Sequence, residues 1–169
     1  STLCSTLFPY TTLFRSALVF TTPHYGASDM TGCMKNLLDH LDFFTMTISP
    51  RKEMFGKKAF ILTTGTGSTA AVNSIKKCLK SWGINRVSSA GIRMFTDKWD
   101  KMPVKKQIKQ EKRLRKAARR FCSMKKKRPY VSTVFMYYIN RFVLKRFIGD
   151  GSYPFEYWKE NGYFDKRPF

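Results

Sequence analysis

Two short segments of the chain carry residue types that suit ligand binding. The first, Thr22-Pro23-His24-Tyr25-Gly26, follows an apolar run and combines a hydroxyl, an imidazole and a glycine. The second, Thr64-Gly65-Thr66-Gly67-Ser68, follows another apolar run and precedes a helical pattern. Ligands of open α/β sheets bind where strands end in such segments. These residues are therefore the candidate site.

The stretch from Gly65 to Ala70 fits the pattern G-x-G-x-x-A of dinucleotide-binding loops. Its glycines would let a pyrophosphate approach a helix N-terminus. That fold also needs a ribose-binding acid about 20 residues further on. No carboxylate follows before Asp97, although Arg86 could contact a 2′-phosphate instead. Two alternatives stay open: a glycine turn whose backbone lies against a flat ligand, and a turn with a purely structural role.

The spacing of nucleophiles, histidines and carboxylates supports no catalytic triad, Cys-His pair or carboxylate pair. His24 is the one histidine in the first segment, and we predict no catalytic residue. We also predict no disulfide framework and no metal site, because the chain has four scattered cysteines and two histidines. This cysteine usage favours a reducing, cytoplasmic environment.

Strands that alternate with helices must position these segments. The predicted strands are apolar and barely alternate, which is typical of a parallel sheet that helices cover. Pro23 should end the first strand, and Gly83 should end the second helix. The expected elements are a strand over 17–20, a helix that buries Met30, Met34, Leu37, Leu38 and Leu41, a loop over 43–55, a strand over 59–64, a helix over 69–82 and a strand over 87–95. Their order predicts the α/β class.

The second half of the chain is basic and helical. The net charge of +21 favours anionic partners. A helix over 103–124 should pack through an incomplete apolar stripe and turn its charges outward. A second helix over 131–147 should bury one apolar face in a core or dimer, and 153–169 should be aromatic-rich coil. The apolar positions of these two helices are Val104, Ile108, Leu114, Ala118 and Phe121, then Val131, Val134, Phe135, Tyr138, Phe142, Val143 and Phe147.

The basic run from Lys98 to Arg128 offers an alternative function, namely an RNA-binding or anionic-membrane-binding module. Base stacking would need aromatic residues among the charges, and the run contains only Trp99 and Phe121. The helix over 131–147 could also lie on a membrane. We expect neither nucleic acid nor a membrane as the partner.

Residues 1–16 need a separate explanation. They form a poor signal peptide, because they start without charge and carry Arg15 at the expected cleavage site. Residues 6–16, TLFPYTTLFRS, are identical to one translated frame of a widely used short-read sequencing adapter. We expect a non-native leader there; a genuine apolar strand is the alternative.

Thr22-Pro23-His24-Tyr25, then Gly32-Cys33-Met34-Lys35 and Leu38-Asp39, resembles the T-P-x-Y…G-x-x-K-x-x-x-D signature of flavodoxin-like, NAD(P)H-dependent FMN reductases. Gly56-Lys57-Lys58, the strand AFILTT, the glycine turn and Trp82-Gly83 follow in that family's order. The segment YPFEYWKENGY, residues 153–163, is similar to the ending of a bacterial subgroup with a helical extension.

The resemblance implies a doubly wound parallel sheet with FMN beside the first and third strands of the intact fold. Thr22, Pro23, His24, Tyr25 and Gly26 would flank the isoalloxazine, and Thr64, Gly65, Thr66, Gly67 and Ser68 would contact its other edge. The flavin would take hydride from NAD(P)H and reduce a small-molecule or protein acceptor. A homodimer is compatible with the family.

The resemblance also implies an incomplete fold. The family's first strand and phosphate loop would precede Ala17, so we expect a truncated flavoprotein with impaired FMN binding and no activity. The expected division is a leader over 1–16, a partial flavodoxin-like domain over 17–101, and a C-terminal helical extension over 102–169 that packs on it.

Overall fold

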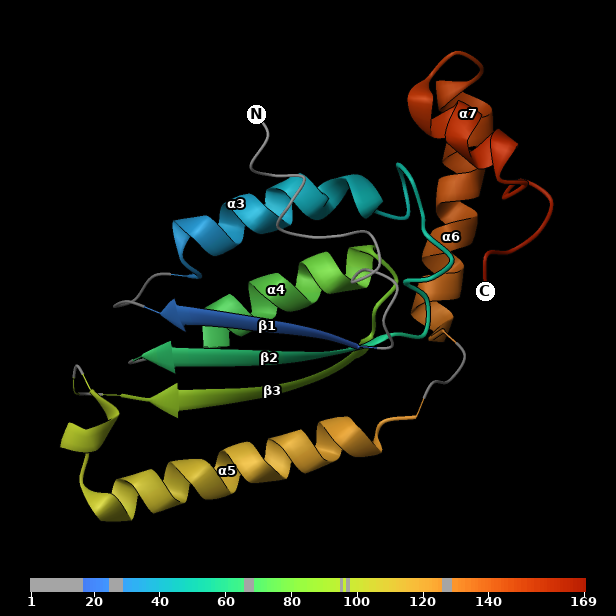
Figure 1. Cartoon of the computed structure of the whole chain (residues 1–169). Helices are drawn as coiled ribbons and strands as arrows, with labels where there is room; N and C mark the ends of the chain where they lie inside the picture. The colour runs from blue at the N-terminus through green and yellow to red at the C-terminus, as the bar shows by residue number, and fades with distance from the viewer. Residues whose placement is uncertain (1–16, 25–28, 66–68, 95, 97, 126–128) are drawn as a thin grey trace.

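A three-stranded parallel sheet forms the centre of the α/β part of the molecule (Figure 1). The computed structural model describes residues 17–24, 29–65, 69–94, 96, 98–125 and 129–169. Its strands are β1 (Ala17–His24), β2 (Lys58–Gly65) and β3 (Arg86–Arg93), paired in the order β1-β2-β3. The predicted α/β class and parallel sheet are confirmed.

Helices cover both faces of this sheet (Figure 1). α3 (Gly32–Leu41) and α4 (Thr69–Ser81) lie on one face, and α5 (Val104–Ser123) lies on the other. Short 3₁₀ turns, η1 (Asp42–Phe44) and η2 (Trp99–Lys101), follow α3 and precede α5. The core on the α3/α4 face contains Phe20, Leu38, Ile61, Val72, Ile75, Leu79 and Trp82. The helix predicted over 69–82 is confirmed as α4.

β1 is longer than predicted, because it continues through Pro23 to His24. The prediction that Pro23 ends the strand was wrong. A proline is tolerated on an edge strand, where one side of the backbone has no ladder to complete. Among the described strands, β1 is such an edge. The strand therefore carries the first candidate segment further along the sheet than the sequence indicated.

α5 packs on β2 and β3 through its C-terminal half. The rings of Phe60 and Phe121 lie 5.5 Å apart, and Ser88 donates a hydrogen bond to the Ala117 carbonyl. Lys58 Nζ donates to the Phe121 carbonyl at 3.0 Å. The predicted stripe is wrong at its start: Val104 and Ile108 are exposed, and Gln107 and Gln110 are half-buried in their place.

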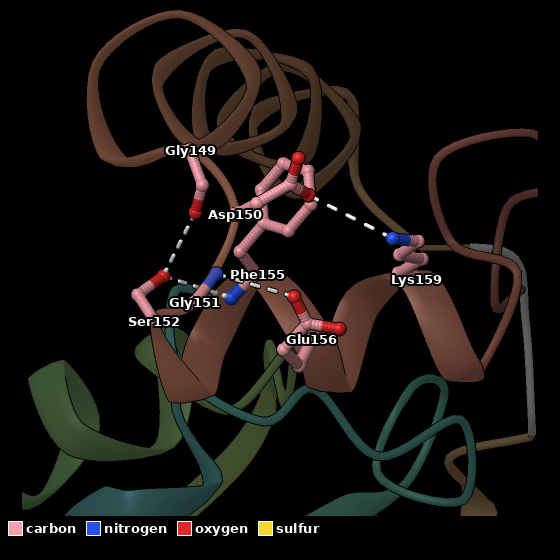
Figure 2. A network of polar contacts seen from close by, with 7 residues as sticks. All are labelled: Gly149, Asp150, Gly151, Ser152, Phe155, Glu156 and Lys159. Atoms are coloured by element: carbon pink, nitrogen blue, oxygen red, sulfur yellow. Dashed lines mark hydrogen bonds and ion pairs between the residues drawn. The ribbon is translucent and has the colours of Figure 1, made fainter.

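The C-terminal part contains α6 (Val131–Val143), a π-helical segment (Leu144–Ile148) and α7 (Tyr153–Glu160). The prediction of coil was wrong over 153–160, which form α7, whereas 161–169 contain no helix or strand. Figure 2 shows why α7 begins where it does: the Ser152 hydroxyl caps the Phe155 N–H, and Glu156 accepts from the Gly151 N–H. Such N-terminal caps typically stabilise a helix by about 1 kcal/mol.

The buried side of α6 packs against α7 and the chain end in a second aromatic core. Tyr137 stacks on Trp158 with ring centroids 5.0 Å apart. Its hydroxyl donates to the Tyr163 carbonyl and, at 3.2 Å, to that of Lys166. The buried members of this core are Tyr137, Leu144, Trp158, Tyr163 and Phe164.

The apolar face predicted to be buried on α6 is largely exposed. Val131, Phe135 and Phe142 are 85%, 63% and 63% exposed. The side that faces the protein carries Thr133, Tyr137, Asn140 and Leu144, which are spaced three and four residues apart. This side packs inward because its hydroxyl groups have hydrogen-bond partners there. Asn85 donates to the Thr133 hydroxyl, and the Tyr137 hydroxyl donates to the Tyr163 carbonyl.

The loop between η1 and β2 joins the two parts of the molecule. The Arg51 guanidinium lies 5.5 Å from the Phe44 ring centroid and 5.4 Å from that of Tyr157. The Phe55 and Phe169 rings are 4.8 Å apart. These contacts hold α7 and the chain end against the α/β part.

Gly65 lies where β1 and β2 end, and its backbone has φ +136°. A Cβ there would lie 1.9 Å from the His24 carbonyl oxygen. The Gly65 carbonyl also accepts from the Met94 N–H at 3.2 Å. Only glycine permits this close approach of the strand ends.

Gly65→Ala should therefore lower the free energy of unfolding by about 2–4 kcal/mol, because backbone must move and the φ angle is strained. Gly32→Ala, where a Cβ meets nothing within 4 Å, should change it by less than about 1 kcal/mol. Urea unfolding measures both. Equal stabilities of the two variants would contradict this account of the strand ends.

Alkaline pH should destabilise the second aromatic core. Burial raises the pKa of Tyr137 and of Tyr163 from about 10 to about 12. As pH rises, the unfolded chain loses these phenol protons before the folded protein does. The contribution of the two tyrosines to the free energy of unfolding is therefore fully present below pH 10 and is lost as pH rises towards 12. Tyr137→Phe removes one titrating group, so its stability should fall less steeply over this window. Tyr138→Phe, at a 45% exposed neighbour, is the control; parallel curves for Tyr137→Phe and the parent would contradict the prediction.

Candidate functional site

The parallel register of β1 and β2 brings the two candidate segments together. Thr22 pairs with Thr63, Pro23 with Thr64, and His24 with Gly65. All these residues lie at the C-terminal edge of the sheet, where ligands of open α/β sheets bind. The predicted site residues Tyr25, Gly26, Thr66, Gly67 and Ser68 lie outside the described residues.

The side chains of Thr22 and His24 point into the α3/α4 layer and are 3% and 5% exposed. Thr22 Oγ1 donates to the Pro23 carbonyl at 3.0 Å and lies 3.3 Å from Thr31 Oγ1. His24 Nδ1 lies 3.3 Å from the Asp29 carbonyl oxygen. Both side chains therefore support the turn from β1 to α3 from within the protein.

Asp29 links this turn to the next helix. Its carboxylate accepts from the Met30 N–H at 2.8 Å and from the hydroxyl of Ser74 on α4. Thr31 then caps α3 by accepting from the Met34 N–H at 3.4 Å. The sequence analysis did not identify Asp29, Ser74 or Thr31 as supporting residues. A threonine just before an apolar helical pattern is a capping signal, whereas no local pattern marks Ser74.

Pro23 and Thr64 face the opposite side of the sheet. Pro23 is exposed and Thr64 is half-buried, and the two are register partners. Further along the same face of β1, Val19 is 63% exposed and Thr21 is also exposed. The accessible part of the site is thus a strip formed by Pro23 and Thr64 at the strand ends.

Arg86 cannot complete a dinucleotide site with the glycine turn. It pairs with Lys58 at the N-terminal end of β2, whereas Gly65 lies at the other end. Eight residues of strand separate the two positions by roughly 23 Å. Arg86 instead places its guanidinium 5.4 Å from the Tyr130 ring centroid. The 2′-phosphate role considered for this arginine is therefore wrong.

α5 holds its basic side chains at the surface of the molecule. The helix carries nine lysines and arginines and one acid, Glu111, and none of its residues is fully buried. Glu111 and Arg115 approach to 3.8 Å in an exposed pair, which contributes little stability. This is the pattern of a helix that covers a sheet with its charges outward.

Within the part of the chain that the structure describes, no three His, Cys, Asp or Glu side chains group as a metal site requires.

Comparison with known proteins agrees with this arrangement. Residues 15–96 match a family model described as NADPH-dependent FMN reductase. No curated protein matches the chain. The matched residues include β1, β2 and β3, both candidate segments and all the supports of the turn after β1. The match supports a flavodoxin-like fold and FMN-dependent NAD(P)H oxidoreductase function. Residues 15–96, which include the three strands of the α/β part, are thus similar to the NADPH-dependent FMN reductase family.

Proposed function

We propose that the C-terminal edge of β1 and β2 holds the isoalloxazine of FMN for reduction by NAD(P)H. The observation that carries this proposal is the register, which sets Pro23 beside Thr64 at the end of the sheet. Both lie within the residues that match the reductase family. The electron acceptor is then a small molecule or a protein, and the expected location is the cytoplasm.

The accessible groups suit one side of an isoalloxazine. Pro23 offers an apolar surface, and the Thr64 hydroxyl is a hydrogen-bond donor and acceptor for the polar edge of the ring. α3 and α4 cover the other face of the sheet, where the adjacent residues Thr22 and Thr63 are buried. Pro23 and Thr64 are therefore not covered by these two helices. The chemistry of this donor set therefore fits the ring system.

The chain contributes binding and orientation in this proposal. When bound, the flavin supplies hydride and electron transfer, which no side chain here provides. Thr22, His24 and Asp29 act as positioning residues, because they hold the turn after β1 through α3 and α4. The rigid strand ends then keep Pro23 and Thr64 in place.

We further propose that this chain of 169 residues binds FMN weakly. β1 is an edge among the described strands, and its face beyond the site is exposed at Val19 and Thr21. A ring bound at the end of β1 would therefore contact protein mainly on its β2 side. Partial enclosure limits the apolar surface that binding removes from water.

Titration of FMN into the purified chain should give a dissociation constant above the micromolar range. Quenching of flavin fluorescence measures it, and consumption of NADPH at saturating FMN tests turnover. Micromolar or tighter binding would contradict the proposed weak site. NADPH oxidation that does not depend on added FMN would contradict the proposed role of the flavin.

Thr64→Val should lower FMN affinity by about two- to tenfold, the usual effect of one lost hydrogen bond. Thr21→Val makes the same chemical change on the same face, two positions before Pro23, and should leave affinity unchanged. Both variants should keep the parent's urea midpoint. Equal FMN affinity of the two variants would place the ring elsewhere.

A further inference from the structure

The outer face of α6 and the π-helical segment is an unusual surface for this protein. We define the α6 outer face by six large apolar side chains that are between 38% and 85% exposed. They are Val131, Phe135, Tyr138, Ile139, Phe142 and Phe147. In a helix, positions 131, 135, 138 and 142 fall on one side, because they are spaced four, three and four residues apart.

Burial on the opposite side shows that this exposure is a consequence of how α6 docks. Tyr137 and Leu144 are fully buried and join the second aromatic core. The buried Asn140 lies on this same side. The helix is therefore held by its inward side, while the α6 outer face contacts solvent. A contiguous apolar face of this kind marks an interaction surface.

The charge around this face indicates the chemistry of its partner. Residues 131–148 include Arg141, Lys145 and Arg146 and no aspartate or glutamate. Lys145 and Arg146 are exposed, and Lys145 Nζ lies 5.2 Å from the centroid of the Phe164 ring. The whole chain has a net charge of +21, so a second copy of it would be repelled. An anionic surface would be attracted.

Contrary to the expectation from the sequence, and because this face is exposed instead of buried, we propose that the α6 outer face binds the surface of an anionic lipid bilayer. Aromatic and aliphatic side chains would enter the boundary between headgroups and acyl chains, and the flanking cations would contact lipid phosphates. This combination is typical of helices that lie in the membrane interface. Among the described residues, no helix has the length and apolarity to cross a bilayer. The protein would therefore lie on the membrane, independently of whether the FMN site is functional.

Sedimentation with sucrose-loaded vesicles tests the proposal on the full chain. The chain should bind vesicles of phosphatidylcholine with phosphatidylserine and bind far less to pure phosphatidylcholine. Raising the salt from about 0.1 M to 0.5 M should weaken binding, because it shortens the Debye length. Lys145→Gln with Arg146→Gln should lower affinity by about fivefold for each charge.

A protein of this charge could adsorb on anionic vesicles through α5 alone, so the decisive variants leave charge unchanged. Phe135→Ser with Phe142→Ser should lower vesicle affinity at least about tenfold, because each ring loses apolar burial. Val104→Ser with Ile108→Ser is the matched control, since these exposed apolar residues lie on α5. That control should bind like the parent. Circular dichroism should show both variants folded, because all four positions are exposed.

Three results would overturn the proposal. The first is absence of binding to anionic vesicles at low salt. The second is equal binding by the Phe135/Phe142 variant and the parent, which would show charge adsorption without the α6 outer face. The third is a stable dimer in sedimentation equilibrium that the Phe135/Phe142 substitutions convert to monomer, because a second copy would then occupy this face.

Discussion

The candidate site depends on the close approach of the ends of β1 and β2. Gly65 leaves no room for a side chain against the His24 carbonyl, and its own carbonyl bonds to the backbone just after β3. The three strand ends are thus tied together through one residue. This contact sets the position of Pro23 beside Thr64, from which the proposed binding surface follows.

The polar groups behind this surface have a different task. Thr22 and His24 turn away from the accessible face, and Asp29 and Ser74 complete the link to α4. Thr22 and His24 are buried polar groups that need hydrogen-bond partners, and their contacts with Thr31 and Asp29 hold the end of β1 against the start of α3. The two faces of β1 therefore have different roles. One face holds the strand end against the start of α3, and the other face remains open to a ligand.

In the C-terminal part, α6 also uses one side for packing and leaves the other side exposed. Tyr137 and Trp158 form the centre of an aromatic core that α7 and the chain end complete. Because the inward side of α6 is used for this core, the apolar residues on its other side remain exposed. Net positive charge then favours an anionic surface over a second copy.

The sequence by itself determined the α/β class and the order of strands and helices, and its motifs showed the similarity to the FMN reductase family. Those features depend on local patterns: apolar runs at β1 and β2, helical spacing in α4, and Gly83 as a helix end. The two candidate segments also followed from local order, since both come directly after strands. Their adjacency was inferable, because parallel strands end at one edge of a sheet.

Only the tertiary structure decided which faces are buried. The amphipathic pattern of α6 predicted its outer residues as core, yet the buried side is set by partners far along the chain, such as Asn85 for Thr133 and Trp158 for Tyr137. The same holds for Thr22 and His24, whose orientation depends on α3 and α4. Local spacing identifies the two sides of an element, but long-range packing and hydrogen bonding choose between them.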